Sequence, residues 1–344
     1  MTGTGLAARI IAWQRQHGRQ GLPWQGTRDP YRVWLSEIML QQTQVVTVID
    51  YYTRFLQRFP TLEALAAAPL DDVLALWSGL GYYSRARNLH RCAQAVVLQH
   101  GGKFPPCSAG LVALPGIGRS TAAAIAAFCF GERAAILDGN VKRVLTRVLG
   151  FGEDLAGSAA QKGLWARAEA LLPMRDVDVY TQGLMDLGAT RCHVRRPDCN
   201  RCPVQAVCAA HAAGQPERYP VKTRKLKRSR RANALLWLNH GARVWLVQRP
   251  ATGVWAGLWS LPEYPDAAAL EALTAGWPGE GRWLPGCVHT LTHLDWHLQP
   301  LRWHWPARRP CHEAPGAGAW FTPSQALAHG LPAPVRRWLS APAD

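Results

Sequence analysis

Apolar residues recur at helical spacing through most of residues 1–190, which predicts a region built from α-helices. One such pattern runs over residues 31–59, and Asp29 and Pro30 before it are typical of a helix N-cap and first turn. Further helices are expected at residues 62–79, 84–99, 120–130, 141–149 and 161–172, most of them bounded by glycine or proline. We therefore expect an all-α region over residues 1–217.

The pattern changes after residue 217. Residues 218–231 are rich in lysine and arginine and almost free of apolar residues, so they cannot bury a core and are expected to form a basic linker. Residues 234–238 and 243–248 resemble a β-hairpin around Asn239-His240-Gly241, and residues 288–305 alternate like a strand. Residues 232–340 also hold eleven of the sixteen tryptophans, most simply as core packing. A second domain, of α/β class, is expected here.

The composition of the chain predicts the kind of partner and the cellular compartment. The 344 residues include 39 Lys and Arg against 23 Asp and Glu, a formal charge of +16, which favours a polyanion as partner, although a basic protein need not bind nucleic acid. The densest apolar stretch, around residues 122–130, is too short to span a bilayer, so no membrane partner is expected. No secretory signal is visible at the N-terminus, and a cytoplasmic protein with reduced or metal-bound cysteines is expected.

Four cysteines, Cys192, Cys199, Cys202 and Cys208, have the spacing C-x6-C-x2-C-x5-C. Four thiolates this close in sequence indicate a metal centre over residues 192–208. The spacing by itself is equally compatible with structural zinc and with an iron-sulfur cluster. Arginines within this loop offer a phosphate-binding surface, or are simply solvated charges.

A glycine-containing turn, Leu114-Pro115-Gly116-Ile117-Gly118, lies between two expected helices, so that residues 108–130 form a helix-hairpin-helix. Glycines allow the backbone to approach a phosphate, and the following helix N-terminus offers free N–H groups. A plain tight turn between helices would look the same.

Two carboxylates are candidates for chemistry. Asp138 precedes an expected helix and is most simply an N-cap. Glu37 shares a mostly apolar helix face with Val33, Trp34 and Leu40, where its carboxyl could remain protonated as an acid, although a carboxylate at the rim of a helix crossing is a comparable interpretation.

Together these features resemble the endonuclease III superfamily of DNA glycosylases, and within it the adenine DNA glycosylase (MutY) family. The matching segments are Leu22-Pro23-Trp24 and residues 34–44 (WLSEIMLQQTQ), 79–83 (GLGYY), 114–122 (LPGIGRSTA), 137–144 (LDGNVKRV) and 185–188 (MDLG), with the four cysteines. They cover essentially the whole helical region. The resemblance implies a 4Fe-4S cluster in place of zinc, and double-stranded DNA with adenine opposite 8-oxoguanine or guanine as the partner of a monomeric, nucleoid-associated bacterial enzyme.

The resemblance also implies residue roles. Glu37 is expected to act as general acid toward adenine and Asp138 to face the sugar, because base release needs a protonated leaving group and a stabilised sugar cation. The base must flip out of the helix, and Gln42 and Tyr82 are candidates for stabilising the distorted DNA. Trp24 and Gln182 are candidates for the adenine pocket. Further candidate substrate or DNA contacts are Thr43, Gly116, Gly118, Ser120, Asn140 and Lys142.

Ser120 occupies the place where the lyase branch of the superfamily carries a lysine nucleophile. A serine cannot form a Schiff base, so a monofunctional glycosylase is expected. The alternatives are a bifunctional glycosylase/lyase acting on oxidised pyrimidines and a non-catalytic DNA-binding protein on the same scaffold.

The second domain resembles a Nudix-like domain through residues 248–250 and 253–259. The glutamate-rich hydrolase box is missing after Glu263, so nucleotide hydrolysis is not expected. By resemblance, the domain recognises 8-oxoguanine through Leu291-Thr292-His293, where the family usually has Phe-Ser-His. Thr292 retains the hydroxyl of the usual serine, whereas Leu291 lacks the aromatic ring of the usual phenylalanine. His289, His293, His297 and His304 suit strand and loop positions better than a metal site.

Overall fold

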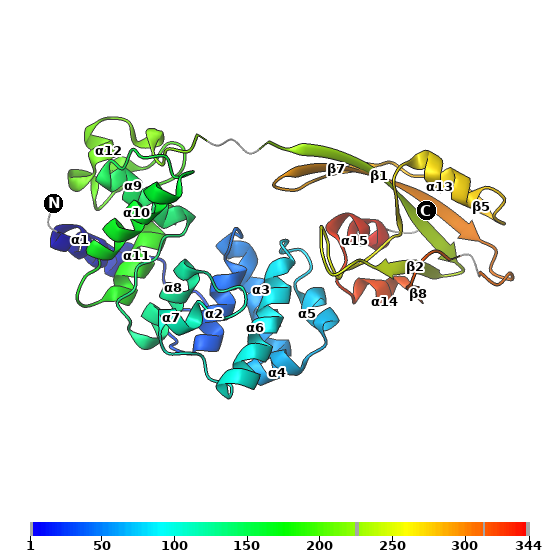
Figure 1. Cartoon of the computed structure of the whole chain (residues 1–344), viewed down its shortest axis with the longest axis horizontal. Coiled ribbons are helices and arrows are strands. Elements are labelled where there is room, and N and C mark those ends of the chain that lie inside the picture. The colour runs from blue at the N-terminus through cyan, green and yellow to red at the C-terminus, as the bar shows by residue number, and fades with distance from the viewer. Residues whose placement is uncertain (1–2, 224–226, 312–313, 342–344) are drawn as a thin grey trace. The chain divides into compact units, whose positions relative to one another are not determined.

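A computed structural model describes residues 3–223, 227–311 and 314–341 of the chain. The chain divides into two units, one made of residues 1–67 and 91–225 and the other of residues 68–90 and 226–344 (Figure 1). Among the described residues, none of the helices has the length and apolar character needed to cross a bilayer.

The first unit is all-helical, as the apolar pattern predicts. Its helices are α1 (Gly3–His17), α2 (Pro30–Met39), α3 (Val45–Arg58), α4 (Leu62–Ala67), most of α6 (Ser84–His100), α7 (Ser108–Leu111), α8 (Arg119–Phe130), α9 (Gly139–Leu149), α10 (Ser158–Ala170), α11 (Val177–Thr190) and α12 (Ala209–Ala212), with short 3-10 turns at Cys199–Arg201, Gln205–Val207 and Pro216–Arg218.

Two of the expected helices are each divided in the structure. The pattern over residues 31–59 continues through α2 and α3, but residues 40–44 form a turn in which Gln42 has a φ of +57°. Apolar spacing does not detect this break because both helices bury the same kind of face. Residues 62–79 are likewise divided into α4 and α5 (Leu70–Leu76), since Pro69 cannot continue a helix. The predicted cap is confirmed: the Asp29 carboxylate accepts a hydrogen bond from the Tyr31 N–H.

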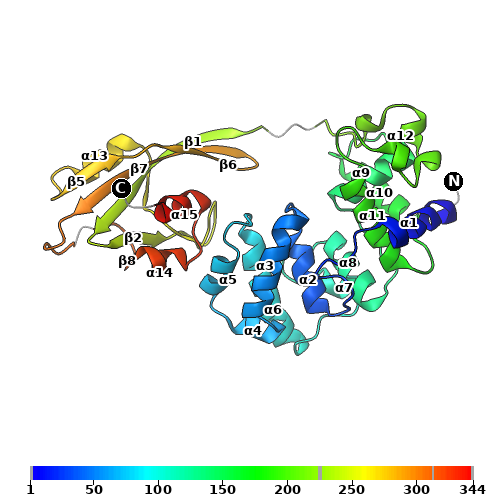
Figure 2. The same ribbon diagram turned by 180° about the vertical axis from the view of Figure 1, so that it is seen from behind.

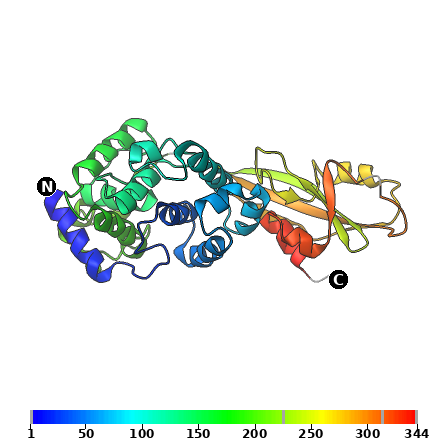
Figure 3. The ribbon, with the colours of Figure 1, turned by 90° about the horizontal axis from the view of Figure 1, so that it is seen from below.

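Helix α11, which the sequence analysis did not predict, packs between α1 and α9 in the core of the first unit. Figure 3 shows α1, in blue, beside the green helices of this unit. Glycines allow this close packing: a Cβ on Gly183 would lie 2.6 Å from Ile10 Cγ2, and one on Gly188 would lie 2.6 Å from Asn140 Cβ. The side chains of α11 are thereby held against the start of α9.

The second unit contains a mixed sheet. Its strands are β1 (Ser229–His240), β2 (Arg243–Gln248), β3 (Trp259–Ser260), β4 (Glu263–Tyr264), β5 (Glu280–Trp283), β6 (Cys287–Thr290), β7 (Leu294–Trp305) and β8 (Gly318–Phe321), and its helices are α5, α13 (Ala267–Thr274), α14 (Pro323–Leu327) and α15 (Ala333–Ser340). The order is β3-β2-β1-β7-β5, with β4 on β1, β6 on β7 and β8 on β2. The two long strands β1 and β7 run in parallel through the middle of the sheet (Figure 2).

The predicted hairpin is confirmed, since β1 and β2 pair antiparallel with His240 opposite Arg243. The linker expected over residues 218–231 was predicted to end too late in the sequence. Strand β1 already begins at Ser229, which lies opposite Leu294 on β7. The side chains of residues 229–232 are exposed, so this stretch pairs through its backbone and leaves no apolar pattern in the sequence. Residues 224–226 of the expected linker lie outside the described residues.

Residues 68–90 belong with the sheet although they precede it by more than a hundred positions. The Trp259 indole N–H donates to Asp71 Oδ2 at 3.2 Å, and the Tyr83 hydroxyl donates to the Leu331 carbonyl at 3.0 Å. The second unit is thereby assembled from two distant parts of the sequence.

Candidate active site and DNA-recognition elements

A cavity of about 800 Å³ opens in the first unit between α2, the start of α9 and α11. Both candidate carboxylates, Glu37 and Asp138, line it. The sequence-predicted residues that share this cavity are Trp24, Glu37, Thr43, Asp138, Asn140 and Gln182. The fold therefore brings together six positions that are spread over 159 residues of sequence.

Glu37 projects from α2 into this cavity. Burial among apolar neighbours and, to a smaller extent, the negative charge of Asp138 raise the pKa of its carboxyl to about 7. At neutral pH a large fraction of Glu37 is therefore protonated and able to donate a proton. The apolar helix face seen in the sequence predicted this environment.

Asp138 both caps a helix and faces the cavity. Its Oδ1 accepts a hydrogen bond from the Val141 N–H at 2.7 Å, so the simple N-cap interpretation is confirmed. Burial raises the pKa of Asp138, while hydrogen bonds from the backbone of Val141 and Asn140 oppose that shift. An N-cap carboxylate is held rigidly, which suits a group that must face a developing positive charge.

The remaining cavity residues are held by their own neighbours. Trp24 is buried and packs edge-on against Tyr52, with ring centroids 5.4 Å apart. The Gln182 amide donates to Asp186 on the same helix. Asn140 Oδ1 accepts from the Arg143 guanidinium at 2.9 Å.

The helix-hairpin-helix is formed by α7, the turn at residues 112–118 and α8. Gly116 has a φ of +76°, so the turn requires glycine there, whereas Gly118 has an ordinary φ of −83° and forms the N-cap of α8. The Ser120 hydroxyl accepts a hydrogen bond from the Leu137 N–H at 2.9 Å. Ser120 thus holds the segment that leads into Asp138. None of these three residues, nor Gln42 or Lys142, lines the cavity.

The four cysteines converge on a separate small cavity next to α9. Arg147, which is almost fully buried, donates to Cys192 Sγ at 3.3 Å, and Arg143 donates to the Cys192 carbonyl at 2.7 Å. In the part of the chain that the structure describes, no three His, Cys, Asp or Glu side chains are placed to hold a single metal ion.

Two predicted DNA contacts meet in the second unit. Tyr82 Oη and Thr292 Oγ1 lie 2.6 Å apart, although 210 positions separate them in sequence. Both residues are exposed, and Tyr82 has a φ of +47°. Gln42, the other residue expected to stabilise the distorted DNA, also has a positive φ. Such strained backbone conformations cluster at functional sites.

Thr292 lies in the turn between β6 and β7. The Leu291 N–H donates to the Leu294 carbonyl, and the His293 carbonyl accepts from both the N–H and the hydroxyl of Ser229. His289, His297 and His304 lie on strands and His293 in this turn, as expected. The turn is therefore tied to the first residue of β1.

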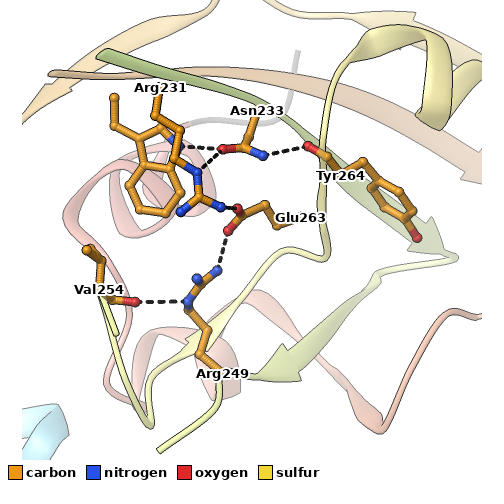
Figure 4. A network of polar contacts seen from close by, with 7 residues as sticks. Arg231, Asn233, Arg249, Val254, Glu263 and Tyr264 are labelled. Carbon is orange, nitrogen blue, oxygen red and sulfur yellow. Dashed lines mark hydrogen bonds and ion pairs between the residues drawn. The ribbon is translucent and has the colours of Figure 1, made fainter. Parts of the chain in front are cut away.

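Glu263, on β4, anchors a polar network that includes Arg231 on β1 (Figure 4). Its two carboxylate oxygens accept hydrogen bonds from Arg231 and Arg249. The Arg231 guanidinium lies 4.7 Å from the ring centroid of Trp296 on β7, and Trp296 in turn stacks on Trp255 with centroids 4.4 Å apart. Glu263 is thus committed to a structural ion pair.

Comparison with known proteins agrees with this arrangement. Residues 35–169 match the HhH-GPD superfamily of base excision DNA repair proteins, and residues 233–341 match the NUDIX domain. The chain is 34% identical to the adenine DNA glycosylase of Buchnera aphidicola subsp. Acyrthosiphon pisum over 98% of both chains. The chain belongs to the adenine DNA glycosylases. The Homo sapiens member of this family is also 34% identical, over 93% of this chain and 70% of its own.

Solved structures resemble the helical part of this adenine DNA glycosylase family member. A thermostable thymine-DNA glycosylase is 28% identical with a TM-score of 0.55, and it covers 62% of this chain and 97% of its own. An endonuclease III–DNA complex gives a TM-score of 0.53 at 21% identity, covering 62% of this chain and 98% of the other. The predicted all-α glycosylase fold and the Nudix-like second domain are confirmed.

Sequence reasoning missed Arg19, which lines the cavity, and its buried partner Asp186. Arg19 follows α1 in a segment without periodicity, so nothing local marks it. Asp186 lies in the matched segment at residues 185–188, which was the only available sequence signal, and the structure buries its side chain inside α11.

Proposed function

We propose that this glycosylase removes adenine paired with 8-oxoguanine or guanine in double-stranded DNA, by hydrolysis of the N-glycosidic bond. The observation that carries the proposal is the pair Glu37 and Asp138 in one cavity, each with a raised pKa. Adenine excision as part of base excision repair is the activity to which family membership points.

The two carboxyls divide the chemistry. Glu37 donates its proton to a ring nitrogen of adenine, which makes the base a neutral leaving group. As the bond between C1′ and the base breaks, the sugar becomes cationic, and Asp138 stabilises that charge. Water then adds at C1′ and its proton returns to Glu37. The products are free adenine and an abasic site.

The cavity can receive adenine only after the nucleotide leaves the duplex. Gln42 and Tyr82, both exposed and both with strained backbones, fill or wedge the distorted helix. Thr292, hydrogen-bonded to Tyr82, reads the base opposite adenine through its hydroxyl. Gly116, Gly118 and Lys142 contact the DNA backbone, and His293 extends the recognition turn.

Hydrolysis without strand cleavage follows from Ser120. Its hydroxyl is engaged by the Leu137 N–H, and it offers no amine for a Schiff base. Borohydride trapping separates this reaction from that of a bifunctional glycosylase/lyase: the lyase would cross-link efficiently to damaged DNA, and this chain would not.

A 4Fe-4S cluster is the group that we assign to Cys192, Cys199, Cys202 and Cys208, which line one small cavity. When bound, it cross-links the loop and holds its arginines rigidly for phosphate contact. Purified protein should contain iron and labile sulfide in equal amounts, and zinc in their place would refute the assignment.

The decisive experiment incubates the protein with three duplexes, which contain adenine opposite 8-oxoguanine, adenine opposite guanine, or thymine glycol opposite adenine. Alkali then cleaves any abasic sites. Cleavage of the first two and not the third is expected. Without product from either adenine duplex the proposal fails.

A further inference from the structure

The α11 wall of the active-site cavity carries one polar group whose orientation is fixed from behind. Gln182 Nε2 donates to Asp186 Oδ1 at 2.8 Å, one helical turn away. The Asp186 side chain is fully buried and also accepts from Arg19, whose Nε lies 2.8 Å from Oδ1 and whose backbone N lies 3.0 Å from Oδ2. Asp186 therefore receives three hydrogen bonds.

These contacts determine which end of the Gln182 amide is available to a ligand. Arg19 donates to Asp186 through both its guanidinium and its backbone N–H, so both Asp186 oxygens serve as hydrogen-bond acceptors. The Gln182 amide therefore turns its NH2 group toward Asp186. Gln182 Oε1 then has no donor among the described residues and is left as an acceptor beside the cavity.

We propose that the Arg19–Asp186 pair is a positioning device that fixes Gln182 as a hydrogen-bond acceptor and thereby selects a base with an exocyclic amine. This inference rests on the proposed function, in which adenine occupies the cavity. Adenine has an amine at C6 that can donate to Oε1. Hypoxanthine has a carbonyl at the same position, which would face Oε1 as a second acceptor.

The Arg19–Asp186 pair is needed because an unrestrained Gln182 carboxamide can turn either its oxygen or its NH2 group toward the ligand. Rotation by 180° exchanges the oxygen and the nitrogen without changing the shape of the side chain. An unanchored Gln182 could turn and donate to the carbonyl of hypoxanthine. A site that offers a fixed acceptor discriminates more strongly, because the wrong base leaves that group unpaired.

The test measures single-turnover release of adenine and of hypoxanthine, each opposite 8-oxoguanine. The readout is the ratio of the two rates in each variant relative to wild type, which cancels the intrinsic reactivity of the bases. Gln182→Met, similar in shape but without the amide, should lower the ratio about tenfold or more. Asp186→Asn should lower it about fivefold, since its amide can hold Gln182 in either orientation. In the Gln182→Met background, Asp186→Asn should change nothing further.

A second variant guards against misfolding of the first. Arg19→Met removes the guanidinium that holds Asp186 Oδ1, so Asp186 no longer fixes the Gln182 amide and the ratio should again fall about fivefold. The matched control is Asp176→Asn, which removes the ion pair between Arg15 on α1 and Asp176 at the N-cap of α11, outside the cavity. It should leave the ratio at the wild-type value.

The outcomes separate this inference from the function on which it rests. If Asp186→Asn or Arg19→Met folds, as judged by thermal unfolding, and keeps the ratio within twofold of wild type, the positioning role is refuted alone. If wild-type protein releases no adenine, the proposed function fails and the inference fails with it. A fall in both rates with an unchanged ratio indicates a merely structural pair and also refutes the inference.

Discussion

Glu37 shows how one residue's environment sets a pH dependence. Its carboxyl must be protonated to act as an acid, and burial raises its pKa to about 7. The single-turnover rate of adenine release should therefore fall about tenfold per pH unit above this value. Glu37→Gln should lose this dependence together with most of the rate. A rate that stays flat from pH 6 to pH 9 would contradict the general-acid role.

The same shift predicts an effect on stability. The folded-state pKa of Glu37 lies above its ordinary value. The contribution of Glu37 to the free energy of unfolding is therefore fully present at low pH, and it is lost as the pH rises through about 7 and the buried carboxyl becomes charged. At pH 8 the Glu37→Gln variant should therefore be more stable than wild type, by at most about 3 kcal/mol in free energy of unfolding, and should unfold at a higher temperature. Thermal melts should show this advantage disappearing below pH 5. An equal difference at both pH values would show that the buried charge is not its cause.

At the scale of elements, the turn before α8 provides a matched pair of glycines. Gly116 has a φ of +76°, so Gly116→Ala should lower the free energy of unfolding by about 1 kcal/mol. Gly118 has an ordinary φ and open space around its Cα, so Gly118→Ala should change stability by less than about 0.5 kcal/mol. Denaturant unfolding measures both. Equal losses would mean that backbone conformation does not distinguish the two positions.

The position of the turn between β6 and β7 is expected to depend on the ion pairs of Glu263. Glu263→Gln leaves Arg231 and Arg249 without a shared counter-charge beneath Trp296, so the turn that carries Thr292 should lose its fixed position. We expect the preference for adenine opposite 8-oxoguanine over guanine to fall about threefold to tenfold. The ratio of the two single-turnover rates measures this. Glu280→Gln, on the exposed edge strand β5, serves as control, and an equal effect there would exclude a specific role for Glu263.

For the whole molecule, the formal charge of +16 predicts salt-dependent DNA affinity. With about six to ten phosphate contacts, affinity for an undamaged duplex should fall about 10³-fold to 10⁵-fold between 50 and 200 mM salt. Fluorescence anisotropy at several salt concentrations gives the slope. The ratio of adenine release opposite 8-oxoguanine and guanine should stay constant, since those contacts are between neutral groups. A shallow slope would show that little of the net charge faces DNA.

The sequence predicted much of this protein because local patterns carried the information. Helical spacing predicted most helices of the first unit, and the apolar face around Glu37 offered, as one of two interpretations, a carboxyl whose pKa burial would raise. Each of these features depends on neighbours within a few turns of the same segment. Pattern alone did not detect the break at residues 40–44, where a strained turn joins two helices with similar buried faces.

Only the tertiary structure decided which distant residues meet. Arg19 and Asp186 are 167 positions apart, and Tyr82 and Thr292 are 210 apart, with no local signal that pairs them. Residues 68–90 likewise belong with a sheet that begins at Ser229. The sequence by itself thus determined most of the elements and the candidate reacting groups, because helix spacing and residue chemistry are local. The orientation of Gln182 and the position of Thr292 were decided by long-range packing, because the groups that hold them come from other parts of the chain.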